Sequence, residues 1–315
     1  MALITMAACL GLAPWVLSDY NLTLLGTGAA YSVAVLGISL GFASVGMLAL
    51  TQPAMMLIGG FIALELVAVW HVPFLAATLV ATAAGAVVAI PLGWLTCRLD
   101  RYAFSVLAFS FTYLVSMLLS SSLLVDVTGG ELGKPFPPST FLGHPLAGLA
   151  SYGLVAVLIL AAFASAAILL RSSLGRRLVV MNQDDIVARA VGLNADAHRI
   201  VITAIVSAFG AMSGALAGQV SGFIAPPRFD VALAVALLAM ALVGGSRYLL
   251  GAFVGTLLLQ VAPAMSSLEQ VDRDLLVGVL LLLCLGIVPD GVLSVEKLWS
   301  ARRRGRAGSR PESTR

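Results

Sequence analysis

The chain has 315 residues, of which 60% are hydrophobic and 10% are charged, and its formal net charge is +3. A soluble domain has about 45–50% apolar and about 25% charged residues, and a globule of this length cannot bury so large an apolar excess in one core. The composition therefore excludes a soluble globular domain and predicts an all-α polytopic membrane protein.

Ten apolar segments are candidate membrane spans, since a helix needs about 20 residues to cross the hydrocarbon core. They cover residues 2–17, 22–42, 53–70, 75–97, 103–124, 147–170, 200–220, 231–244, 250–268 and 275–289. The shortest, 231–244, is a candidate for a broken or tilted element. An even number of spans predicts that both termini lie on the same side of the membrane.

The basic residues are distributed very unevenly over the two sides that ten spans define. Of the 18 Lys and Arg residues, only Lys134, Arg228 and Arg273 fall on one side, which leaves 15 on the side of the termini. Because Lys and Arg are retained in the cytoplasm, we expect both termini to be cytoplasmic. Residues 1–295 then form one membrane domain, and residues 296–315 form a basic, disordered cytoplasmic tail that lies near anionic lipid headgroups rather than on nucleic acid.

One polar stretch, MNQDDIVARAVGLN at residues 181–194, interrupts the apolar sequence. It lies within the long cytoplasmic connection 171–199. Asp184 and Asp185 suit the first turn of a short helix, and Gly192 suits its end. A helix this short is unstable alone, so the pattern predicts a docking helix for a cytoplasmic partner. The alternative is a connector that lies flat on the membrane surface.

Two further segments, 41–53 (GFASVGMLALTQP) and 220–230 (VSGFIAPPRFD), place glycine, hydroxyl and proline residues between apolar runs. Irregular backbone at membrane depth is tolerated only where protein or a water-filled path covers it, and interrupted helices at matching places in two halves indicate a transport path and an inverted repeat. Ordinary packing of small residues is the alternative. The candidate residues of the path are Gly41, Ser44, Gly46, Thr51, Gln52, Glu65, Gly244 and Gly245.

Glu65 is the one ionisable residue expected inside a span, and intramembrane acids are functional candidates. Its functional role would be a place in the path or a pairing with another subunit. The alternative is a position close enough to the membrane surface to reach lipid headgroups. The cysteines Cys9, Cys97 and Cys284 are far apart and the histidines His71, His144 and His198 are isolated. These patterns predict no metal site, no catalytic group and no cofactor in this chain.

The run from Arg171 to Gly218, which includes the polar stretch, resembles permease subunits of branched-chain amino-acid ABC importers, in particular the M-type (LivM) member. GFASVGMLALTQPAMMLIGGF at 41–61, VTGGELG at 127–133, FIAPPRFDVALAVALLAMALVGGSRYLLGAFVG at 223–255 and the C-terminal LLLCLGIVPDGVL agree in order and spacing. The resemblance covers most of residues 22–295.

The resemblance implies a type II-like importer fold, in which two permease subunits sit over two cytoplasmic ATPases and beneath an extracytoplasmic solute-binding protein, in a bacterial inner membrane. The polar stretch then is the coupling helix that contacts the ATPase, through Asp184, Asp185, Arg189, Ala190 and Gly192. The chain has no GxxxxGK[ST] loop, so ATP would be bound by the partner subunits. The loop around VTGGELG is expected to contact the binding protein or to be merely structural.

The sequence departs from the family pattern at Gln52, where His is usual, and at Arg247, where glycine is common, which leaves the solute open among branched-chain amino acids, urea or amides, and related small acids. An ion-coupled secondary transporter or channel is the alternative function, but that class usually buries several charges along its path. A membrane enzyme would need clustered acids or histidines, which this sequence lacks.

Overall fold

The computed structural model describes residues 6–7, 9–11, 18–45, 50–99, 101–138, 140–141, 144–145, 149–173, 175, 194–245, 249–261 and 278–279. The tail 296–315, all of the expected span 275–289 except residues 278–279, and most of the expected span 2–17 lie outside these residues. So do positions 176–193, with all five predicted coupling residues.

The described part of the chain is an α-helical bundle. Its main helices are α2 (Asp19–Val45), α3 (Gln52–Ala68), α4 (Phe74–Thr96), α5 (Arg101–Ser120), α7 (Leu149–Arg171), α10 (Ala195–Ser221), α11 (Val231–Gly244) and α12 (Leu249–Thr256), the last continuing as a π-helical turn over Leu257–Val261. Six helical segments are long and apolar enough to cross a membrane, while Gln52–Ala68 and Leu250–Val261 are shorter apolar helices. The prediction of an all-α polytopic membrane protein is confirmed.

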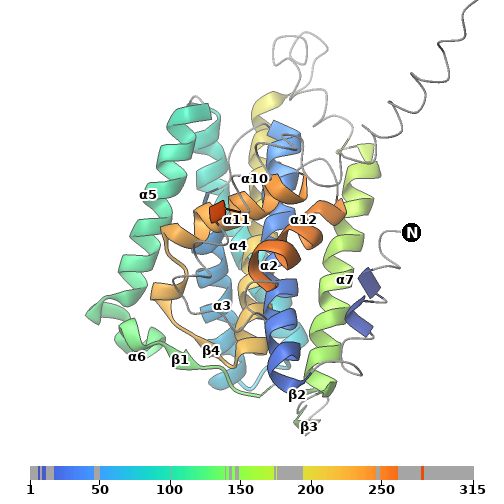
Figure 1. Ribbon diagram of the computed structural model, residues 1–315. Helices are drawn as coiled ribbons and strands as arrows, with labels where there is room; N and C mark the ends of the chain where they lie inside the picture. Colours follow the sequence, from blue (N-terminus) through green and yellow to red (C-terminus); the bar gives the residue numbers. More distant parts are fainter. Residues whose placement is uncertain are drawn as a thin grey trace, which may run out of the picture.

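Helix α10 lies at the centre of the bundle and packs against α2, α3 and α4. It can approach them closely because small residues recur on its surface. The bundle has a clear inside and outside: 83% of the most apolar stretch of α2 is buried, against 22% for α5. In Figure 1, α11 and α12 cross the front of the bundle between α5 and α7, and both contact α2.

Two loops far apart in the sequence meet at one end of the bundle, the lower end in Figure 1. Strand β1 (Lys134–Pro135) pairs antiparallel with strand β4 (Phe223–Ile224). The backbone N–H of Phe136 donates to the carbonyl of Gly222 at 2.9 Å, and its ring meets that of Phe74 edge to face. A second short pair joins β2 (Thr140–Phe141) to β3 (His144–Pro145). We call the β1–β4 contact and its surroundings the outer junction.

One expected boundary is wrong. The fifth span was predicted to run to residue 124, but α5 ends at Ser120, and a 3-10 turn, η1 (Ser122–Leu124), follows an extended Ser121. Three consecutive serines occur here, and the Ser121 hydroxyl donates to the Leu118 carbonyl at 2.6 Å. Serine side chains that bond nearby backbone compete with helix continuation, which explains the early end in a segment that is apolar on average.

Candidate translocation site

The predicted interruption at 41–53 is present as a break between two helices. Helix α2 ends at Val45 and α3 begins at Gln52, with Pro53 in its first turn. Proline suits that position because the first N–H groups of a helix have no partner within it. Thr51, the residue before the helix, is buried. The chain thus starts a new helix inside the protein rather than at its surface.

The start of α3 lies deep in the membrane domain, as two hydrogen bonds show. The Thr112 hydroxyl, from the middle of α5, donates to the Leu50 carbonyl at 2.8 Å. The Gln52 amide Nε2 donates to the Val206 carbonyl at 3.0 Å. Val206 lies eleven residues, or about 17 Å, from the first residue of α10, and the whole helix is about 40 Å long. An unpaired helix start at this depth is tolerated because protein surrounds it.

The Gln52 side chain is fully buried and is packed between two glycines. A methyl group on Gly37 of α2 would meet its Nε2 at 2.9 Å, and one on Gly210 of α10 would overlap its Oε1. The amide therefore fits only because both neighbours lack a side chain. Gln52 joins the first turn of α3 to both α2 and α10.

Unpaired polar oxygens accompany this packing. The Gln52 Oε1 and the hydroxyls of Ser39 and Ser207 are buried and have no hydrogen-bond partner within the described part of the chain. Buried polar groups are nearly always paired, so each such group calls for an explanation. Ser207 follows Val206 in α10, and Ser39 lies within α2. The middle of the bundle thus holds acceptors that a polar solute or water could pair with.

The predicted path residues on α2 share a face with this contact. Gly37, Gly41 and Ser44 follow one another at helical spacing, so they lie along one side of α2. Gly41 and Ser44 are both buried. Gly46 lies outside the described residues.

Gly244 and Gly245 occupy a different corner. They end α11, where Gly245 has a positive φ of 92°, and the space beside Gly244 is filled by the backbone of Gly251 in α12. Their close contact is with α12, whereas Gln52 contacts α2 and α10. Helix α11 has the same bounds as the short predicted segment 231–244; a broken or tilted element there and an inverted repeat stay predictions.

Glu65 is the predicted path residue that the structure separates from Gln52. It lies thirteen residues along α3, or about 20 Å away, and its Oε1 pairs with Lys134 Nζ at 3.2 Å. Lys134 also donates to the Asp126 carbonyl. The two side chains are 30% and 27% exposed, so the pair lies at the surface of the protein. The partner of Glu65 belongs to the outer junction of the same chain.

Sequence reasoning did not find the residues of α10 that complete the site. Their signal is the spacing of Gly210, Gly214 and Gly218, which places three small residues on one face. A methyl group on Gly214 would overlap the Met56 carbonyl oxygen, and one on Gly59 would overlap the backbone of Ala211. Backbone contact between α3 and α10 therefore extends along the helix from the Gln52 level toward the outer junction.

Fold and site together define a class, a polytopic α-helical membrane protein with a helix break at membrane depth. Comparison with known proteins identifies the family. The model of the branched-chain amino acid transport system permease component family matches residues 20–286. The chain belongs to this family, and it is therefore a transport subunit of the membrane.

Relatives with curated names agree with this assignment. The high-affinity branched-chain amino acid transport system permease protein LivH of Salmonella typhimurium strain LT2 is 27% identical over 295 residues, which cover 86% of this chain and 94% of LivH. The LivH protein of Escherichia coli K12 shows the same identity and coverage. No solved structure matches the chain significantly. The family resemblance seen in the sequence is confirmed; the matches do not separate an M-type from an H-type subunit.

Proposed function

We propose that the chain is the permease subunit of an ATP-binding-cassette importer of a bacterial inner membrane, with both termini cytoplasmic. Its solute is a branched-chain amino acid or a related small polar molecule, and its path passes the helix break at Gln52. The observation that carries this proposal is the buried start of α3 at membrane depth in a chain that matches a permease family over residues 20–286.

The character of the break supports a polar, uncharged lining. Gln52, Ser39 and Ser207 supply acceptors without formal charge, which suits a small zwitterion or amide that brings its own donors. The packing of Gly37 and Gly210 against Gln52 means that α3 must shift relative to α2 and α10 before a solute can pass. In an importer, separate subunits would drive this movement.

The driver of that movement, in this proposal, is a pair of cytoplasmic ATPase subunits that seat the helix around residues 184–192. Asp184, Asp185 and Arg189 provide polar contacts there, and Ala190 and Gly192 allow close approach. A second, homologous permease and an extracytoplasmic solute-binding protein complete the assembly. The sequence resemblance indicates the M-type member of the pair, and the LivH names of the curated relatives make the H-type member the alternative.

An ion-coupled secondary transporter is less well supported. It would rest on intramembrane charge, and Glu65, the acid that the sequence offers, is paired with Lys134 at the outer junction. A transporter driven by protons or Na⁺ would have to use other groups.

A co-purification experiment tests the proposal. The full chain is expressed with its neighbouring genes, solubilised in detergent and purified by a tag on the permease. We expect an ATPase and a second permease to be recovered with the wild type and the ATPase to be lost with Gly192→Arg. The matched control, Gly305→Arg in the basic tail, should keep it. Wild-type protein that carries no ATPase, yet moves solute in vesicles without ATP, would establish the secondary transporter instead. The co-purified permease also decides between M-type and H-type.

A further inference from the structure

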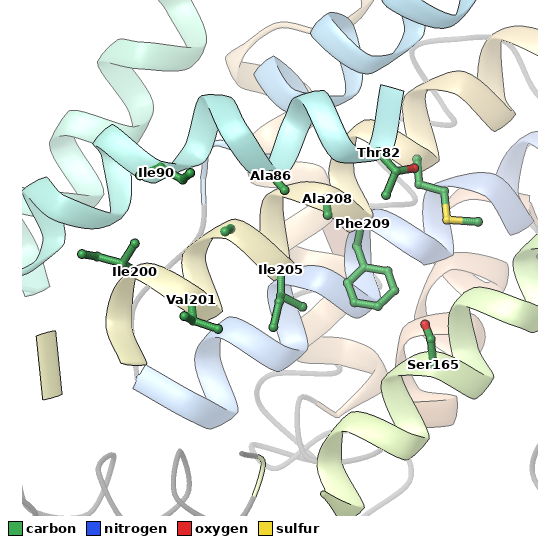
Figure 2. A pocket seen from close by; sticks show the side chains of 11 residues that line it. Thr82, Ala86, Ile90, Ser165, Ile200, Val201, Ile205, Ala208 and Phe209 are labelled. Atoms are coloured by element: carbon green, nitrogen blue, oxygen red, sulfur yellow. The ribbon is translucent and has the colours of Figure 1, made fainter. Parts of the chain in front are cut away.

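A groove of about 470 Å³ lies on the outside of the bundle between α4, α7 and α10. Helix α4 contributes Thr82, Ala86 and Ile90, α7 contributes Ser165, and α10 contributes one face between Ile200 and Met212. Figure 2 shows these side chains converging from the three helices. The face of α10 that contacts Gln52 is a different one, so the groove is separate from the helix break.

The groove offers no free hydrogen-bond donor to a polar guest. Its two hydroxyl groups are already used within their own helices: Thr82 donates to the Thr78 carbonyl and Ser165 to the Ala162 carbonyl, both at 2.7 Å. The other lining side chains are apolar. The carboxylate or amide oxygen of a polar solute would lose its hydration here with no donor to replace it, which disfavours the transported solute and selects an apolar occupant.

The dimensions fit one leaflet of a bilayer. Ile200 and Met212 are twelve residues apart along α10, or about 18 Å, and half of a hydrocarbon core of about 30 Å is of similar depth. At the rim, Ile90 is 48% exposed and Val201 is 43% exposed, so the groove opens sideways. An acyl chain can therefore enter it from the membrane.

Positive charge gathers at one end of the groove. Each of the three helices carries an arginine where it reaches that end: Arg98 just after α4, Arg171 at the end of α7 and Arg199 in the first turns of α10. The ends of α4 and α10 meet there, since Cys97 Sγ contacts the Asp196 carbonyl at 3.5 Å. The end of α7 lies at the same upper end of the bundle in Figure 1, with α2 between it and α4 in this view. The Arg98 guanidinium lies over the Trp94 ring, 4.0 Å from its centroid, and the residue is exposed.

From this geometry we propose that the groove binds an anionic phospholipid, with an acyl chain along α10 and the phosphate at Arg98 and Arg199, where the ends of α4 and α10 meet. Apolar lining, leaflet depth and clustered basic residues at one end are together what such a lipid requires. The site lies at the end of the bundle that the charge distribution assigns to the cytoplasm. A bound lipid there would bridge α4, α7 and α10.

Native mass spectrometry of the full chain in detergent tests this with phosphatidylglycerol and phosphatidylcholine of identical chains. Wild-type protein should retain phosphatidylglycerol preferentially. Ala208→Phe, which fills the groove, should lower the occupancy by both lipids about tenfold. Val157→Phe, at an exposed position of α7 outside the groove, is the matched control and should change neither.

The headgroup is tested separately by Arg98→Gln, a change at an exposed side chain. This variant should bind phosphatidylglycerol about fivefold more weakly, which is the contribution of one arginine near anionic lipid. Its binding of phosphatidylcholine should be unchanged. An unaltered preference in this variant overturns the proposal even if Ala208→Phe does not fold. Lipid occupancy equal to that of the wild type in a folded Ala208→Phe variant also overturns it. A second protein chain that binds the wild type and is lost in Ala208→Phe would overturn it too, because the groove would then be a protein interface.

Discussion

The two ends of α3 are held in different ways. At its start, in the middle of the bundle, the uncharged Gln52 is packed between Gly37 and Gly210 and bonds the Val206 carbonyl. At its far end, Glu65 pairs with Lys134 at the surface of the protein. Inside the membrane domain the contact depends on missing side chains and backbone proximity, whereas at the surface it depends on charge and on paired loops. The difference predicts which substitutions each end tolerates.

The largest effect on stability is expected from Gly214→Ala. The added methyl would overlap the Met56 carbonyl, so the backbones of α3 and α10 must separate, and overpacking of this kind costs about 1–3 kcal/mol. The melting temperature of the purified protein should fall by several degrees. The control is Gly153→Ala in α7, where nothing lies within 4 Å of the new methyl. Equal melting temperatures for the two variants would contradict the close contact.

The outer junction is tested by Gly133→Ala, with Gly222→Ala as its partner measurement. Both residues have positive φ, 71° and 66°, and only Gly222 is in the left-handed helical region, while Gly133 has a ψ of −172° that glycine alone adopts readily. Alanine is therefore strained at both positions, by about 1–3 kcal/mol each. Only the methyl at residue 133 would also meet the Ile224 carbonyl, while nothing lies near the one at residue 222. Gly133→Ala should therefore lower the unfolding temperature more than Gly222→Ala does. A larger loss at Gly222 would mean that the loops do not meet as described.

The smallest effect is expected from Glu65→Gln. A pair whose side chains are 27–30% exposed contributes less than about 1 kcal/mol, and salt should reduce the difference from wild type. Thermal unfolding at low and high salt measures this stability difference. The double variant Glu65→Lys with Lys134→Glu should recover most of the stability that Glu65→Gln loses. Solute uptake should persist in Glu65→Gln. If uptake disappears while stability is unchanged, Glu65 belongs to the path after all.

Much of the fold could be predicted from the sequence because apolar runs between polar punctuation report directly on membrane helices. The runs 22–42, 75–97 and 200–220 lie within or nearly coincide with α2, α4 and α10. The break before Gln52 was also predictable, since glycine, hydroxyl and proline residues interrupt that run. The end of α5 was not, because an average over apolar residues does not register three serines.

Contacts between distant segments could not be predicted in the same way. Strands β1 and β4 have two residues each, too few for any periodic pattern, and so the partner of Glu65 stayed hidden. The contact of Gln52 with Val206 uses a backbone carbonyl, which carries no residue-specific signal. The spacing of Gly210, Gly214 and Gly218 did hold information, but it identifies a close helix contact without naming the helix that makes it.

The central claim is that solute passes the break at Gln52, and uptake by Gln52→Leu tests it most directly. The assembled importer is placed in vesicles, and ATP-driven uptake is measured for the branched-chain amino acid or amide that the wild type takes up fastest. Gln219→Leu is the control, since its Oε1 is also buried without a partner among the described residues but lies near the end of α10. We predict that Gln52→Leu lowers uptake about tenfold, which corresponds to the loss of one hydrogen bond to a charged group. Its melting temperature should be almost unchanged, and Gln219→Leu should take up solute normally. Wild-type uptake by Gln52→Leu would contradict the claim and leave Gln52 as a packing residue.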